Sequence, residues 1–101
     1  MNNLLPEQYI DKLKPNLLIT KLLKHLKQNH NITESDFNNI SIDAEYNTRF
    51  KGTGRGKCAL MNGSNCWLKK YQNRHGPIIE ESNNTYILRN VWKNILNNTN
   101  I

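Results

Sequence analysis

Residues 47–76 form a block of thirty residues with seven basic side chains and no acidic one. A small domain can carry such a segment when RNA supplies the missing burial and the counter-charge. We therefore expect a polyanion to bind here. The seven cations are Arg49, Lys51, Arg55, Lys57, Lys69, Lys70 and Arg74.

The remaining charge and the chain length narrow the choice of partner. The 101 residues allow one domain at most, and fourteen Lys and Arg against eight Asp and Glu give a net charge of +6. Nucleic acid is the first expectation for such a chain, and an anionic membrane surface is the second. No apolar run is longer than four residues, far below the roughly 20 needed to cross a bilayer. We expect no membrane insertion.

Residues 1–46 predict an N-terminal helical segment. Leucines and isoleucines recur at helical spacing on both sides of Pro15, which indicates two helices with a break. Lys21, Lys24 and Lys27 lie on the opposite face of the second helix, most simply as a solvated surface and alternatively as phosphate contacts. Thr33 and Asp36 mark a further helix start.

A short strand and a C-terminal helix complete the expected elements. The alternation over 40–44 predicts a strand. Within 77–101, Thr85 is a candidate cap for a helix whose apolar residues recur at helical spacing and include Trp92, expected in the core. The predicted fold is mainly α: a small irregular α-helical domain with a long basic loop or extended segments, stabilised on RNA. The apolar residues of the last helix are Leu88, Val91, Trp92, Ile95 and Leu96.

The segment Arg49–Lys57 alternates cations with glycines and predicts an RNA-binding loop. Glycine lets backbone N–H groups approach phosphate oxygens closely, while arginine and lysine supply charge. It is not a Walker loop, because Cys58 follows Gly56-Lys57 where Ser or Thr is required. A flexible, solvated loop is the alternative. The glycines of this region are Gly52, Gly54, Gly56 and Gly63.

Aromatic residues are interleaved with the cations of the same block. Phe50, Trp67 and Tyr71 stand among the basic residues of 49–74, a pattern typical of proteins that stack unpaired RNA bases on aromatic rings. For Trp67, next to a leucine, core packing is the favoured interpretation.

The spacing of the cysteines and histidines is only weak evidence for a metal site. Cys58, Cys66 and His75 could bind zinc, but the tight cysteine knuckles of structural zinc sites are absent. A metal-assisted nuclease built on them, or on the run Asn73–Gly76, lacks a second aligned histidine. We expect no metal, no cofactor, no small-molecule substrate and no enzymatic activity.

Two motifs resemble the family of ribosomal small-subunit protein fourteen. Arg55–Gly63 is similar to that family's Arg-Asn-Arg-Cys-x-x-Thr-Gly-Arg element, and Tyr86–Leu96 to its Phe-x-Leu-Ser-Arg-Ile-x-Phe-Arg-Glu-Leu helix. The spacing between the motifs is longer here, and the family's Trp-containing ending is missing. The resemblance implies a zinc-free member that contacts ribosomal RNA through Arg55, Lys57 and Arg89.

The expected function is therefore a structural constituent of the ribosomal small subunit that binds ribosomal RNA and neighbouring ribosomal proteins. Eighteen asparagines suggest an AT-rich coding sequence, and the first fifteen residues contain no Arg-rich transit segment. These features point to an organelle-encoded protein of a protist mitochondrion. The alternative is a small viral or bacterial effector. The expected RNA-binding residues are Arg49, Lys51, Arg55, Lys57, Lys69, Lys70, Arg74 and Arg89.

Overall fold

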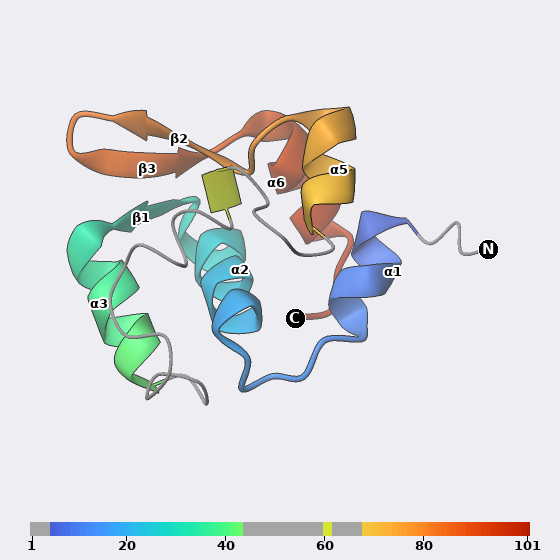
Figure 1. The fold of residues 1–101 in the computed structure, drawn as a ribbon, viewed down its shortest axis with the longest axis horizontal. Helices are drawn as coiled ribbons and strands as arrows, with labels where there is room; N and C mark the ends of the chain where they lie inside the picture. The colour runs from blue at the N-terminus through green and yellow to red at the C-terminus, as the bar shows by residue number, and fades with distance from the viewer. Residues whose placement is uncertain (1–4, 44–59, 62–67) are drawn as a thin grey trace.

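The computed structural model describes residues 5–43, 60–61 and 68–101. These residues are mostly helical and add a small antiparallel sheet, so the expected mainly α fold is better described as mixed α and β (Figure 1). The helices are α1 (Pro6–Asp11), α2 (Leu18–Asn29), α3 (Glu34–Asp43), α5 (Leu68–His75) and α6 (Asn90–Asn97). The strands are β1 (Asn31–Thr33), β2 (Ile79–Ser82) and β3 (Thr85–Leu88).

The predicted break between two N-terminal helices is confirmed. Helix α1 ends at Asp11 and α2 begins at Leu18, with Pro15 in the connection. Proline in the interior of a helix would remove a backbone hydrogen bond and clash with the preceding turn. Helix α2 ends where His30 adopts a left-handed conformation with φ 66°, which turns the chain directly into β1.

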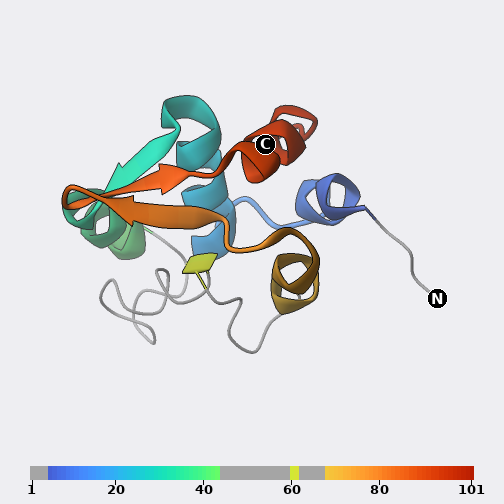
Figure 2. The same ribbon diagram turned by 90° about the horizontal axis from the view of Figure 1, so that it is seen from above.

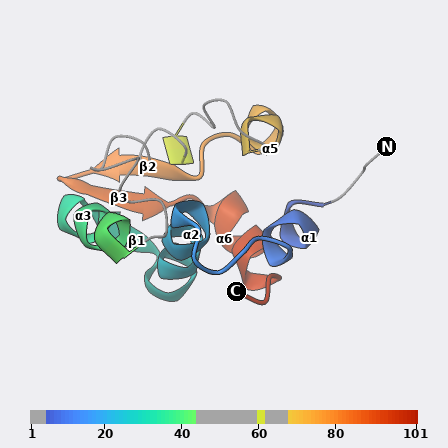
Figure 3. The same ribbon diagram turned by 60° about the horizontal axis from the view of Figure 1, so that its bottom comes forward.

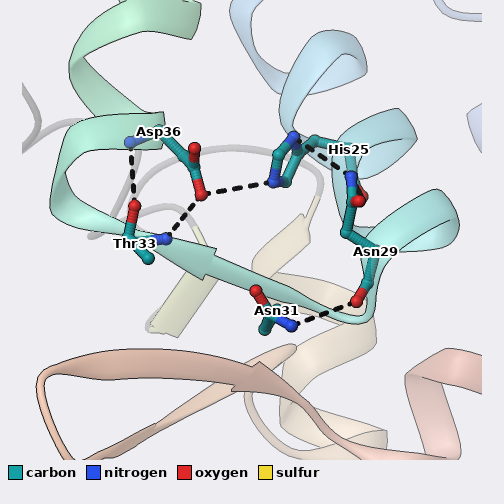
Figure 4. Close-up of polar contacts among 5 residues, drawn as sticks. All are labelled: His25, Asn29, Asn31, Thr33 and Asp36. Atoms are coloured by element: carbon teal, nitrogen blue, oxygen red, sulfur yellow. Dashed lines mark hydrogen bonds and ion pairs between the residues drawn. The ribbon is translucent and has the colours of Figure 1, made fainter.

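The predicted helix start at Thr33 is also confirmed. The Thr33 backbone N–H donates to Asp36 Oδ2 at 3.0 Å, and the Asp36 N–H donates to Thr33 Oγ1 at 3.1 Å (Figure 4). This reciprocal capping satisfies two backbone donors at the start of α3. The strand predicted over 40–44 is wrong for 40–43, which continue α3, while residue 44 lies outside the described residues. Phe37 and Ile40, three apart, both pack inwards and keep the helical period.

The helix predicted from Thr85 is wrong in its first turn. Thr85–Leu88 is strand β3, which pairs with β1 and β2 in the antiparallel order β1-β3-β2. Tyr86 and Leu88 are buried whereas Ile87 is exposed, which is the period of a strand. Helix α6 begins only at Asn90.

The helices lie beside the three-stranded sheet (Figure 2), and an apolar core of described residues joins them to it. Its largest side chain is Trp92, which is completely buried, so the predicted core position of this tryptophan is confirmed. Leu60 also belongs to the core, and its carbonyl accepts the N–H of Ile78 at 2.9 Å. The buried apolar side chains are Ile10, Leu22, Leu23, Leu26, Ile32, Phe37, Leu60, Tyr71, Ile78, Ile79, Tyr86, Leu88, Trp92, Ile95 and Leu96.

The last residues of the chain lie beside the N-terminal helices (Figure 3), and hydrogen bonds hold them there. Lys27 Nζ donates to the carbonyl oxygens of Thr99 at 2.6 Å and Ile101 at 3.2 Å. The Asn100 N–H donates to Asp11 Oδ1 at 2.6 Å. Lys27 of the α2 basic face therefore has a structural contact.

Candidate nucleic-acid interface

The predicted RNA-binding residues divide into two groups. Arg49, Lys51, Arg55 and Lys57 lie outside the described residues, together with Phe50, Cys58, Cys66, Trp67 and the glycines of the loop. The structure places the other four. Lys69, Lys70 and Arg74 lie on α5, and Arg89 lies between β3 and α6.

Helix α5 presents one continuous basic face. Lys69, Lys70, Asn73 and Arg74 are all exposed, whereas Tyr71 and Gln72 between them are buried. The helix lies at the edge of the molecule (Figures 1 to 3). Among the described residues, no carboxylate forms an ion pair with these three cations. Asn73 was not singled out from the sequence as an RNA-binding residue, although its position between Lys70 and Arg74 at helical spacing would have indicated it.

The inner side of α5 is anchored by Tyr71. This ring is only 3% exposed and packs edge-on against Tyr9 of α1, with 6.2 Å between the ring centroids. Lys70 Nζ lies 5.7 Å from the centroid of the same ring. Burial raises the pKa of the Tyr71 hydroxyl, and Tyr9 adds to this rise. Tyr71 is therefore a core residue, and the expectation that it stacks on RNA bases is wrong.

Two side chains from the start of α6 hold the C-terminal end of α5. Arg89 Nη1 donates to the carbonyl oxygens of His75 at 3.0 Å and Pro77 at 2.9 Å. The indole Nε1–H of Trp92 donates to the carbonyl between them, that of Gly76, at 2.9 Å. Three consecutive carbonyls at a helix C-terminus thus receive donors, one of them cationic. We call Arg89 and Trp92 the α5 clamp.

Gly76 makes this arrangement possible. Its φ of +87° lies in the left-handed region, and its N–H donates to the Gln72 carbonyl at 2.7 Å to end the helix. A Cβ built on Gly76 would collide with the Arg89 guanidinium. Sequence reasoning assigned Arg89 to RNA and did not connect it to Gly76, because their contact exists only in the folded chain.

A second polar cluster joins α2 to α3 around His25 (Figure 4). His25 Nε2 lies 3.4 Å from Asp36 Oδ2, and its Nδ1 lies 3.4 Å from the Asn29 amide nitrogen. The carboxylate of Asp36 also caps α3, and its contact with the Thr33 N–H lowers the pKa of Asp36 most. Both ring nitrogens of His25 thus face structural partners, and the cluster ties two helices together rather than presenting a base to a nucleophile.

The β2–β3 hairpin carries negative charge at the described surface, whereas α5 carries positive charge. Glu80 and Glu81 are exposed on β2, and the β2–β3 turn points away from α5 (Figure 1). These carboxylates repel a polyanion, so a polyanion bound to α5 has a more favourable electrostatic energy when it extends away from the hairpin.

His75 is the residue of the weak zinc set that lies within the described part of the chain. His75 is half-buried, and its ring packs edge-on against Trp92 at 5.9 Å. Within the described ranges, no three His, Cys, Asp or Glu side chains gather as a possible metal site. No helix in this part of the chain has the length and apolar character needed to span a membrane.

Comparisons with known proteins assign no relative to this chain. No family model matches it, and neither the curated proteins nor the solved structures include a significant match.

Proposed function

We propose that this protein is a non-enzymatic RNA-binding protein whose basic segment 47–76 carries the affinity. One observation supports the proposal above all: α5, at the end of that segment, exposes Lys69, Lys70 and Arg74 on one face. Exposed cations on a rigid element neutralise phosphates and release counterions from the RNA.

The more specific proposal is a structural constituent of the small subunit of a mitochondrial ribosome. It rests on the resemblance of Arg55–Gly63 and Tyr86–Leu96 to ribosomal small-subunit protein fourteen. Its partners would be ribosomal RNA and neighbouring small-subunit proteins. Arg89 keeps one donor nitrogen on the carbonyls of His75 and Pro77, so its proposed RNA contact would have to use the rest of its guanidinium.

The salt dependence of RNA affinity tests the general proposal. Changing Arg49, Lys51, Arg55 and Lys57 together to Gln removes four potential phosphate contacts. The slope of log K against log salt should then flatten by roughly 3 units. An unchanged slope would show that the basic segment does not carry the affinity.

The second candidate is a free-standing effector that binds another macromolecule. The core favours it, because buried apolar side chains come from all the described helices and strands and need no RNA to complete them. Cosedimentation with small ribosomal subunits at high salt separates the two proposals. A ribosomal constituent remains bound under those conditions, whereas an effector without a ribosomal target is released.

A further inference from the structure

The side chains on the exposed face of α5 indicate which form of RNA this face can bind. The face consists of Lys69, Lys70, Asn73 and Arg74, and α5 is an eight-residue helix about 12 Å long. All four side chains can donate hydrogen bonds, and the three cations have no ion-pair partner among the described residues.

This face offers no platform for an unpaired base. Tyr71 is the aromatic residue of α5, and it is buried against Tyr9 with the Lys70 ammonium nearby. In the described parts of the chain no Phe, Tyr or Trp side chain is exposed: Tyr9 is half-buried, and Phe37, Tyr86 and Trp92 are buried. Proteins bind single-stranded RNA largely by stacking its bases on accessible aromatic rings. The described surface lacks an exposed Phe, Tyr or Trp ring for this purpose.

The same face suits the backbone of a double helix. Paired RNA hides its base edges in a deep, narrow major groove and is recognised through phosphates, 2′-hydroxyls and shape. Cations and an amide on a helix supply donors for those oxygens without needing access to bases.

The α5 clamp keeps this surface in place before RNA arrives. Arg89 and Trp92 hold the carbonyls of residues 75–77, and Tyr71 anchors the opposite side of the helix. A surface that is already ordered loses less conformational entropy on binding.

We infer that the exposed face of α5 is a docking surface for double-helical RNA, which it contacts through the phosphate backbone. This inference rests on the proposed RNA-binding function and specifies which form of RNA α5 contacts.

Binding of the full chain to three labelled probes tests the inference. The probes are an RNA stem-loop, an unstructured RNA strand of the same length and a DNA duplex of the stem sequence. The wild-type protein should bind the stem at least about fivefold more tightly than the other two. The triple variant Lys69→Gln, Lys70→Gln and Arg74→Gln should lose at least about tenfold in stem affinity, and its salt slope should flatten by about 2.7 units.

A matched control removes three cations elsewhere. Lys12 and Lys14 are exposed, Lys93 is partly exposed, and all three lie outside α5, so changing them to Gln alters the net charge equally. This variant should keep the preference for the RNA stem. The slope of log K against log salt should flatten by less than about half a unit per cation removed. An equal loss in both variants would show that net charge, not the α5 face, drives stem binding.

The outcomes distinguish this inference from the proposed function. No binding to either RNA would contradict both. RNA binding with a preference for the unstructured strand would overturn only the docking inference, and equal or tighter binding of the DNA duplex would overturn the choice of RNA. If circular dichroism shows that the triple variant loses helix, each single variant should still flatten the slope by about 0.9 unit, and unchanged single slopes would overturn the inference.

Discussion

At the scale of single residues, Trp92 combines burial with a polar contact. Its indole is fully buried, and its Nε1–H donates to the Gly76 carbonyl. Trp92→Ala should lower the free energy of unfolding by about 3–5 kcal/mol. Trp92→Phe keeps a ring but loses the donor, and should lower it by about 1–3 kcal/mol. Chemical denaturation measures both, and Lys93→Ala on the neighbouring position is the control. A Trp92→Phe variant as stable as wild type would contradict a role for the hydrogen bond, and equal losses for the two Trp92 variants would contradict a packing contribution of the ring.

Gly76 is the second residue whose substitution has a specific expected cost. Gly76→Ala places a Cβ at φ +87° and against the Arg89 guanidinium, so it should lower the free energy of unfolding by about 1–3 kcal/mol. In an Arg89→Ala background only the backbone cost remains. A double-mutant cycle should therefore give a coupling of about 1 kcal/mol between the two positions. Additive effects would show that the collision with Arg89 is relieved without cost.

At the scale of elements, the capping of α3 links stability to pH. The pKa of Asp36 is lowered below its ordinary 3.8, chiefly by the hydrogen bond from the Thr33 N–H. Burial opposes this effect in part, and the Thr33 hydroxyl and His25 lower the pKa further. Because the folded pKa is the lower one, the stabilisation is complete above the ordinary value and is lost as the pH falls through the folded value.

Asp36→Asn tests this linkage. The variant should be less stable near pH 7 by about 0.5–1 kcal/mol, at the low end for a helix cap because the site is partly exposed. It should also lose less stability than the wild type between neutral pH and acid. Unfolding midpoints measured across that pH range check the prediction, with exposed Glu81→Gln as control. Parallel pH curves for wild type and Asp36→Asn would contradict it.

The β2–β3 hairpin depends on two asparagines with positive φ, 50° at Asn83 and 66° at Asn84. Asparagine and glycine tolerate this conformation, and β-branched residues do not. Asn84→Val should lower the free energy of unfolding by about 1–2 kcal/mol, whereas Asn84→Gly should leave it unchanged or raise it slightly. Thermal unfolding of the two variants provides the comparison, and similar midpoints would contradict the strained-turn explanation.

These elements also show why the sequence predicted some features and missed others. Thr33 and Asp36 form a local signal, so the start of α3 was predictable. Residues 85–88 fit the helical period and the strand period equally well, and the deciding signal was the Asn83-Asn84 pair between two short apolar runs. The exposed cations of α5 followed from charge alone. The contact of Arg89 with His75 did not, because it joins residues fourteen positions apart through tertiary structure.

At the scale of the whole molecule, the core changes the expectation that the fold depends on RNA. Ile10 of α1 and Leu96 of α6 are both completely buried, although they lie at opposite ends of the described chain. Contacts between α1 and α6, together with the Asp11–Asn100 hydrogen bond, bring these ends together. Elements that share one core gain their burial energy together, which is the condition for cooperative unfolding.

The RNA-free protein should therefore unfold in one transition, with a free energy of about 5–10 kcal/mol. Ile10→Ala and Leu96→Ala should each lower it by about 2–5 kcal/mol, and circular dichroism and intrinsic fluorescence should report the same midpoint for each variant. Glu80→Ala, on the exposed face of the sheet, should shift the midpoint little. If Ile10→Ala left the main transition unchanged and only α1 melted early, α1 would be an appendage of the core. A chain that folded only after RNA was added would instead return the fold to dependence on its partner.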